Sequence, residues 1–228
     1  MEPKLRVPFD VNRGFLEALS IVREGFPFIV VPAALSVAAA LLGFWYVGFW
    51  YVSLVLLVLT AFMAYFFRDP QRITPDDPNL VVAPADGKVT RVKPVADGAD
   101  SPTVVSIFLS PLDVHINRAP IQGKITDMVY SRGKFLMATN EMASLVNEQN
   151  ALTIEGEKIT VVCKQIAGIL ARRIVCWKKP GETVALGERF GMIKFSSRTD
   201  VLLPPNVQVT VTEGTRVRGG TTVIGRIL

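Results

Sequence analysis

The single histidine of the chain, His115, stands in a segment whose residue types can support acid–base chemistry. It comes shortly after the apolar run 104–109, in the order Ser-Pro-Leu-Asp-Val-His. Histidine is the side chain whose unperturbed pKa lies closest to neutral pH, so His115 is the natural candidate for a general base. Because the chain has one histidine and no pair of Cys-x-x-Cys motifs, a zinc hydrolase is excluded and no metal site is predicted.

A carboxylate and two hydroxyls complete a set of reactive groups. Asp86 lies in the turn sequence Pro-Ala-Asp-Gly, and Ser196 and Ser197 follow the apolar segment 192–195. Carboxylate, imidazole and hydroxyl are the parts of a nucleophile that a general base activates. The spacing by itself does not bring these residues together, and a serine pair after a strand is more often part of a turn.

The apolar residues that position this set are distributed unevenly. Residues 26–67 contain no charged side chain, which is typical of two membrane crossings of about 20 residues each. We expect helices over Phe26–Leu42 and Phe49–Phe67, joined by a tight turn rich in the aromatic residues that favour a membrane interface. A hairpin buried in a soluble core is the alternative, and a signal peptide is disfavoured because the run is too long and begins after residue 25.

The charge pattern predicts the topology and the partners. Basic residues flank the apolar run on both sides, which predicts that both ends lie in the cytoplasm and that the soluble part faces the cytoplasmic side of the cell (inner) membrane. The net charge of +5 suits a domain resting on an anionic leaflet. Since the basic residues are scattered, no nucleic acid is expected as a partner. Cys163 and Cys176 are expected to be reduced, buried thiols.

The sequence pattern of the remaining residues predicts a β-rich domain. Short β-branched runs alternate with glycine turns from Leu80 onward, which predicts a mainly β barrel-like or sandwich-like domain with few short helices. One helix is expected over Thr139–Glu148. The predicted organisation is a cytoplasmic N-terminal segment (1–25), a transmembrane helical hairpin (26–67), a linker (68–79) and a β-rich catalytic domain (80–228). The expected strands are 80–83, 88–93, 103–109, 123–130, 151–154, 158–166, 172–177, 192–195, 206–211 and 221–228.

At these residues the chain resembles the short, membrane-anchored form of phosphatidylserine decarboxylase, a family of pyruvoyl-dependent enzymes. The resemblance covers nearly everything from Tyr65 to Leu228, and several separate motifs occur in the right order. The segments that carry it are 66–70 (Phe-Phe-Arg-Asp-Pro), 84–87 (Pro-Ala-Asp-Gly), 108–115, 133–135 (Gly-Lys-Phe), 147–148 (Asn-Glu), 165–168, 171–175 and 187–200.

The resemblance implies a self-processing enzyme. Ser197 would attack the carbonyl carbon of Ser196, and the chain would break into residues 1–196 and 197–228, with Ser197 converted into a covalent pyruvoyl group. His115 would take the proton of the Ser197 hydroxyl, and Asp86 would orient His115. The pyruvoyl ketone would react with the substrate amine and accept the electrons released as carbon dioxide leaves. The implied substrate is the phospholipid phosphatidylserine, and the implied product is phosphatidylethanolamine.

Two positions depart from the family pattern. The family usually has glycine before the cleaved serine, where this chain has Ser196. Long-form relatives carry a second histidine three residues after the first, where this chain has Arg118, so His115 serves both steps or Arg118 shares one. Headgroup contacts are predicted for Arg132, Lys134 and Arg198, whose side chains can meet a phosphate or lie beside the reactive serine.

Three other interpretations stay open at this point. A non-catalytic, membrane-anchored adaptor with a lipoyl-like β-barrel would not need Asp86, His115 and Ser197 together. A processing-deficient homologue would result if Ser196 blocks cleavage. A different serine phospholipid would share the same headgroup. Edge strands of a small β domain also favour pairing between subunits, which predicts a homodimer.

Overall fold

The structure is a computed structural model, and it describes residues 20–98, 101–137, 142–169, 173–195 and 197–228. The described residues form two compact units, one ending at Gln71 and the other comprising Arg72–Leu228. We describe each unit by itself. Ser196, one of the two residues at the predicted cleavage site, lies outside the described residues, as do the first residues of the predicted 139–148 helix.

The first unit is a helical hairpin. A 3-10 turn, Arg23–Gly25, leads into helix α2 (Phe26–Leu42), and helix α3 (Gly48–Phe66) returns antiparallel to it. Ser36 and Ser53 join the two helices, since each hydroxyl donates a hydrogen bond to the other residue's carbonyl oxygen, at 2.8 and 2.9 Å. Such reciprocal bonds satisfy the hydroxyls between two apolar helices.

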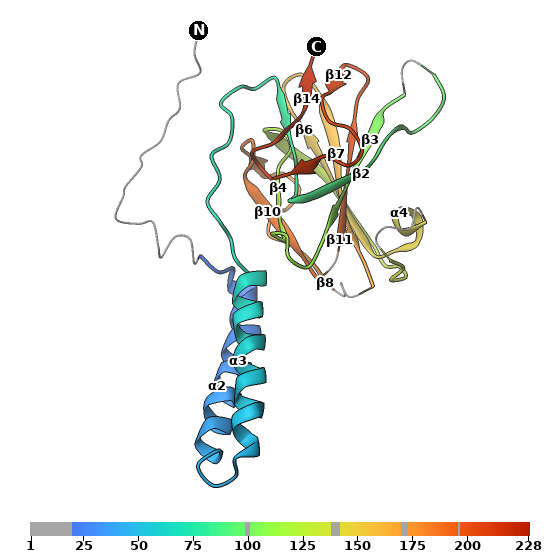
Figure 1. Cartoon of the computed structure of the whole chain (residues 1–228). Helices are drawn as coiled ribbons and strands as arrows, with labels where there is room; N and C mark the ends of the chain where they lie inside the picture. The colour runs from blue at the N-terminus through green and yellow to red at the C-terminus, as the bar shows by residue number, and fades with distance from the viewer. Residues whose placement is uncertain (1–19, 99–100, 138–141, 170–172, 196) are drawn as a thin grey trace. The chain divides into compact units, whose positions relative to one another are not determined.

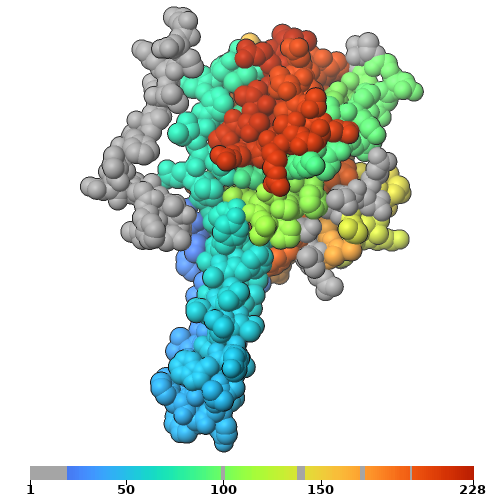
Figure 2. Space-filling model, in the orientation of Figure 1, coloured from blue at the N-terminus to red at the C-terminus, as the bar shows by residue number. Residues whose placement is uncertain are grey.

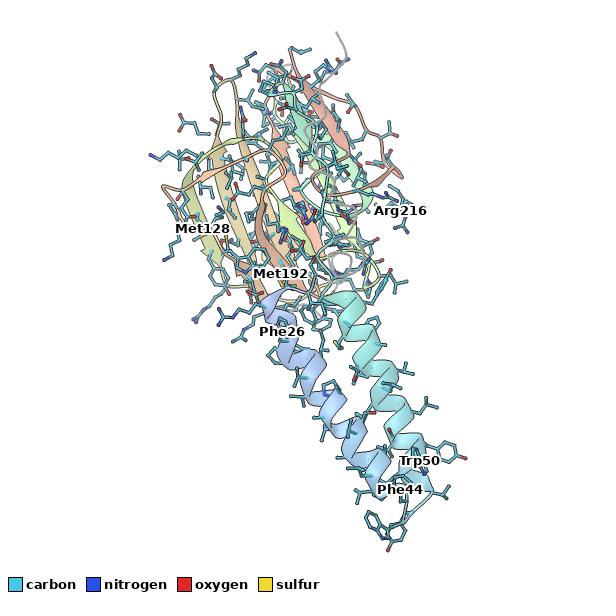
Figure 3. The ribbon with its side chains drawn as sticks, turned by 90° about the vertical axis from the view of Figure 1, so that its left-hand side faces the viewer. Phe26, Phe44, Trp50, Met128, Met192 and Arg216 are labelled. Atoms are coloured by element: carbon cyan, nitrogen blue, oxygen red, sulfur yellow. The ribbon has the colours of Figure 1, made fainter. Side chains whose placement is uncertain are left out.

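The surface of this hairpin is apolar. At its turn, the rings of Phe44 and Trp50 lie edge to face with centroids 5.5 Å apart (Figure 3). Arg23–Leu42 and Gly48–Phe66 are long and apolar enough to cross a membrane, and most of their large side chains are exposed. Exposure of this kind is costly in water and favourable in lipid. The hairpin is therefore compatible with membrane association, and the predicted helix bounds hold to within one residue.

The second unit consists mainly of strands that form a curled sheet, so the predicted mainly β class is confirmed (Figure 1). An eight-stranded sheet has the order β13-β2-β3-β11-β7-β6-β5-β9, and two three-stranded sheets have the orders β1-β14-β12 and β4-β10-β8. The strands are β1 (Leu80–Val82), β2 (Gly87–Pro94), β3 (Thr103–Leu109), β4 (Ile116–Arg118), β5 (Gly123–Ser131), β6 (Gln149–Glu155), β7 (Thr160–Ala167), β8 (Arg173–Cys176), β9 (Thr183–Val184), β10 (Arg189–Lys194), β11 (Ser197–Leu203), β12 (Val207–Val209), β13 (Arg216–Val217) and β14 (Val223–Ile227).

Apolar side chains from these sheets share one core. Val105, Ile107 and Leu109 of β3 lie in it, together with Val201 and Leu203 of β11. The C-terminal residues, red in Figure 2, form a continuous part of the visible surface of this unit. Strand β6 alternates between buried and less buried residues, whereas β3 and β11 are buried at nearly every position.

Two sequence-based expectations need correction. The helix expected over 139–148 is a single turn, α4 (Ala143–Val146), within the described residues. The residues after Ser197 form a long strand, β11, which lies at the centre of the eight-stranded sheet and was not predicted. Its first four residues are polar, so they lack the apolar alternation by which strands are recognised in a sequence.

Candidate active site

The strand register brings the predicted reactive residues to one end of the eight-stranded sheet. Ser197, the first residue of β11, is paired with Leu109, the last residue of β3. On the other side of β3, Lys88 of β2 is paired with Phe108, so Asp86 lies just before the start of β2 at the same end. His115 follows β3 after a short turn. Three segments that are far apart in the sequence thus converge at the end of β3.

A hydrogen-bonded turn holds His115. The backbone N–H of Ser110 donates to the Asp113 carboxylate at 2.8 Å, which closes the turn between β3 and β4. The Nδ1 atom of His115 lies 2.9 Å from the carbonyl oxygen of Asp113, and the N–H of Ile193 donates to the His115 carbonyl oxygen at 3.2 Å. If Nδ1 carries the proton, Nε2 is the nitrogen that can accept one. Asp113 therefore shapes the segment that carries the buried imidazole.

Asp86 is fixed by two donors. A guanidinium nitrogen of Arg72 lies 2.7 Å from one carboxylate oxygen, and the backbone N–H of Gly219 donates to the other at 2.8 Å. Burial raises the pKa of Asp86 above its ordinary value, although Arg72 and Gly219 act in the opposite direction. Because these described bonds lead to Arg72 and Gly219, the role of Asp86 in orienting His115 stays a prediction.

The hydroxyl of Ser197 is a buried polar group at this end of the sheet. The side chain is fully buried, and its Oγ atom has no hydrogen-bond partner within the part of the chain that the structure describes. Buried hydroxyls are normally bonded, so an unbonded one calls for a functional explanation. Such a hydroxyl has no competing bond to break before it gives its proton to a base.

The backbone just before the predicted cleavage site is strained. Phe195 has a φ of 66°, in the left-handed region that bulky residues rarely adopt. A conformation of this kind costs about 1–3 kcal/mol and persists only where the surrounding structure imposes it. Strain therefore lies within two residues of Ser197, where release of the chain would remove it.

A chain of buried side-chain hydrogen bonds connects the strands around this site. Asn150 of β6 donates to Gln165 of β7 at 3.0 Å, and Gln165 donates to Asn117 of β4 at 2.9 Å. Asn117 in turn donates to the Thr199 hydroxyl of β11 at 3.0 Å. Asn117 and Thr199 are each two residues from His115 and Ser197, respectively. The amide chain therefore fixes the strand of the candidate base relative to the strand of the candidate nucleophile.

Removing the central amide will test this role. We expect Gln165→Ala to lower the free energy of unfolding by about 2–3 kcal/mol, because Asn117 and Asn150 each lose one buried hydrogen bond. It will also slow self-cleavage, whereas Gln208→Ala, at an exposed position of β12, will change neither. Thermal unfolding and the time course of cleavage are the measurements. Equal behaviour of the two variants would contradict the positioning role.

The three predicted headgroup residues occupy different environments. Arg132 and Lys134 are exposed in the connection that follows β5. Arg198 is buried, and its Nε and Nη2 atoms lie 2.7 and 2.8 Å from the two carboxylate oxygens of Asp200. This two-point pairing fixes β11 next to Ser197. Substrate contact by all three residues stays a prediction, and the environment of Arg198 indicates a positioning role.

Arg118 and Asn147 also have roles that the sequence did not reveal. Arg118, where long-form relatives have histidine, is buried and donates to the Gly187 carbonyl oxygen at 3.2 Å. Asn147 accepts a bond from the N–H of Leu136 at 2.8 Å and donates to the carbonyl oxygens of Leu136 and Ala167 at 2.9 and 2.7 Å. Asn147 therefore holds the β5–β6 connection against the end of β7. The Asn-Glu pair was visible in the sequence, but nothing there indicated this role.

Comparison with known proteins identifies the class to which this fold and site belong. Residues 59–225 match the family model described as phosphatidylserine decarboxylase. A relative from Solibacter usitatus is 50% identical over 195 residues, covering 86% of this chain and 92% of its own length, and is named phosphatidylserine decarboxylase proenzyme. Relatives with the same name from Geotalea uraniireducens and Carboxydothermus hydrogenoformans are each 43% identical, covering 90% and 92% of this chain.

The chain belongs to the phosphatidylserine decarboxylase family. The resemblance predicted from the sequence motifs is thereby confirmed. Each of these relatives is named as a proenzyme, and the matches reach 92–98% of the relatives' lengths, so both units have counterparts there.

Proposed function

We propose that this chain decarboxylates phosphatidylserine to phosphatidylethanolamine, at a pyruvoyl group that it makes from Ser197 by cleaving itself between Ser196 and Ser197. The observation that carries the proposal is the buried, unbonded hydroxyl of Ser197 at the sheet end shared with His115 and Asp86. Burial without a partner is not specific by itself, since the Ser106 hydroxyl shares it, but an adaptor would not need such a hydroxyl at the sheet end where Asp86 and His115 also lie. Membership of the decarboxylase family supports the same reaction.

Self-cleavage needs a nucleophile and a base. The Ser197 oxygen attacks the carbonyl carbon of Ser196 while His115 takes the hydroxyl proton, and the peptide C–N bond is replaced by an ester C–O bond. A base then removes the Cα proton of Ser197 while the Ser196 carboxylate leaves its Cβ atom, which produces an enamine. Water adds to the imine tautomer of this enamine, which releases ammonia and leaves the pyruvoyl ketone. The left-handed backbone at Phe195 favours the first step, since breaking the chain relieves its strain.

The site fits a small ketone at the start of β11. The first residue of β11 is enclosed by the ends of β3 and β7, with Leu109 and Ala167 as its register partners. When present, the pyruvoyl group supplies a ketone that accepts the electrons released with carbon dioxide. His115 would donate a proton to the product carbon, and Arg132 and Lys134, which are exposed after β5, would meet the headgroup phosphate. Asp86 would hold His115 in the orientation for both steps.

The same proposal includes the topology. Residues 26–67 would cross the cell membrane twice, residues 68–79 would be a linker, and residues 80–228 would act on the cytoplasmic side. The apolar surface of the hairpin and the basic residues on both sides of it support this arrangement. A homodimer through the sheet edges belongs to the proposal as well.

The intact mass of the purified protein tests the proposal. We expect two chains, residues 1–196 and 197–228, with the smaller chain beginning in a pyruvoyl group in place of serine. The pair should also release carbon dioxide from phosphatidylserine. A single uncut chain without activity would reduce the assignment to shared ancestry.

A substitution at Ser196, the residue before the cleaved bond, tests how the backbone at this position affects the rate of cleavage. We expect Ser196→Gly to accelerate cleavage several-fold, because glycine accepts backbone conformations that other residues resist. A time course of the uncut chain after synthesis, followed by gel electrophoresis, measures the effect. If the wild-type chain never cleaved and the Ser196→Gly variant did, the protein would be a processing-deficient homologue.

A further inference from the structure

Exposed apolar side chains gather at the end of the β unit where Ser197 lies. Strands β3 and β7 both run antiparallel to β11, and both end beside Ser197, at Leu109 and Ala167. The chain that follows each strand therefore extends beyond the sheet at this end. The β5–β6 connection does the same, because Ser131 is paired with Gln149 and Gln149 with Ile166.

These three connections carry the residues that we call the apolar rim. Its members are large apolar side chains that are at least one-third exposed although they belong to a well-packed unit: Leu112, Phe135, Met137, Met142, Leu145 and Ile169. Leu145 is 72% exposed and Met137 61%. The described connections at the opposite end, residues 95–98, 101–102 and 156–159, expose one large apolar side chain, Val95. The apolar surface is thus concentrated at the reactive end.

Hydrogen bonds join two parts of the rim, the β5–β6 connection and the end of β7. The N–H of Lys134 donates to the carbonyl oxygen of Val146 at 2.6 Å, and Asn147 bonds to both Leu136 and Ala167. These bonds bring the segment that carries Phe135 and Met137, the turn that carries Leu145, and the end of β7 before Ile169 into one structure. Figure 1 shows the segment with α4 projecting from the sheet. The exposed side chains therefore flank backbone segments that are held by hydrogen bonds.

The charges beside the rim identify what covers it. Arg132, Lys134 and Arg173 are exposed on the same connections or at the start of β8. Apolar side chains with cationic neighbours are the composition of a surface that enters the interface of an anionic bilayer. The same chain also carries two helices able to cross a membrane, which keep the β unit near lipid.

We propose that the apolar rim inserts into the lipid surface, so that the headgroup of a bilayer lipid reaches Ser197 while its acyl chains stay in the membrane. This proposal rests on the proposed decarboxylase function and adds to the hairpin a second, shallower contact with the bilayer. The rim removes the need to extract the lipid fully, since only the headgroup must leave the interface.

The experiment compares two forms of the substrate with the full-length, self-cleaved protein. One form is long-chain phosphatidylserine in phosphatidylcholine vesicles that contain the enzyme, and the other is dihexanoyl-phosphatidylserine dissolved as monomers. We expect the double variant Met137→Ser/Leu145→Ser to lose about tenfold or more in activity on vesicles, because less apolar surface enters the lipid. Activity on the dissolved monomers should stay within about twofold of the wild type. Leu145→Met should keep both activities.

Val95→Ser is the matched control, because Val95 is 55% exposed at the opposite end of the sheet. It should change neither activity. Equal loss of activity on both substrates, no loss on either, or a changed oligomeric state in the rim variant would overturn the proposal. If the wild type and every variant were inactive on both substrates, the proposed function itself would have failed. These outcomes distinguish a failure of the rim proposal from a failure of the proposed decarboxylase function.

A second measurement does not depend on activity. In vesicles that contain brominated phosphatidylcholine, a tryptophan introduced by Leu145→Trp should be quenched beyond the background of the native tryptophans. The tryptophan of Val95→Trp should add no quenched signal. Equal quenching at both positions, or none at position 145, would contradict insertion of the rim.

Discussion

Replacing Ser197 with alanine will leave the chain uncut and will lower decarboxylation by at least about 10⁴-fold. The alanine has no oxygen with which to attack the preceding carbonyl, and no residue from which the ketone can form. Loss of the nucleophile in enzymes of this kind removes most of the rate enhancement. Intact mass and carbon dioxide release measure the two effects. An adaptor protein would keep its function after the same change.

A matched control exists on the neighbouring strand. Ser106 of β3 is also fully buried, and its hydroxyl likewise has no partner among the described residues. Ser106→Ala removes the same atom at the middle of β3, where Ser106 is paired with Asp200, three residues away from the register pair of Ser197 and Leu109. We expect this variant to cleave at the wild-type rate. If Ser106→Ala blocked cleavage as fully as Ser197→Ala, the assignment of the nucleophile would be wrong.

The second large effect concerns the turn that carries Asp86. Gly87 has a φ of 152°, and a Cβ atom added there would lie 2.1 Å from the carbonyl oxygen of Phe108. We expect Gly87→Ala to lower the free energy of unfolding by about 3 kcal/mol, because the backbone of β2 must move away from β3. The midpoint of thermal unfolding of the full chain should fall by about 10 °C. Self-cleavage should slow strongly, since Asp86 moves with the turn.

The substitution Gly98→Ala is the control that distinguishes the cost of backbone strain from the cost of the steric clash in Gly87→Ala. It also has a positive φ, 123°, but a Cβ atom added there would have no neighbour within 4 Å. Gly98→Ala therefore costs the conformational strain alone, about 1 kcal/mol, or about 3 °C in the unfolding midpoint. It should leave the rate of cleavage unchanged. Equal effects of the two substitutions would show that close packing against Phe108 is not what places Asp86.

The sequence was sufficient to predict the bounds of elements that consist of a continuous apolar run. Strand β3 was predicted at its observed bounds, Thr103–Leu109, because its sequence Thr-Val-Val-Ser-Ile-Phe-Leu is rich in apolar and β-branched residues. The helices of the hairpin were predicted to within one residue, since a long uncharged run admits few other structures. The types of the candidate reactive residues were also visible, because a single histidine leaves few choices for a base.

Strand β11 shows where sequence patterns stop being informative. Ser197, Arg198, Thr199 and Asp200 are all buried, although polar residues at four consecutive positions are typical of a turn. Three of these polar groups are satisfied inside the fold: Asp200 pairs with Arg198 within the strand, and Asn117 of β4 donates a hydrogen bond to Thr199. No periodicity encodes a polar group that is satisfied by a distant residue.

The sequence by itself therefore determined the class of fold, the apolar hairpin, the family and the chemical types at the candidate site. Only the tertiary structure decided that Asp86, His115 and Ser197 lie at one end of a sheet, that Arg72 and Gly219 hold Asp86, and that Asn147 orders the apolar rim. The physical reason is that patterning reports which side of each element is buried. Hydrogen bonds between distant residues, by contrast, depend on strand register, which is set when the whole sheet assembles.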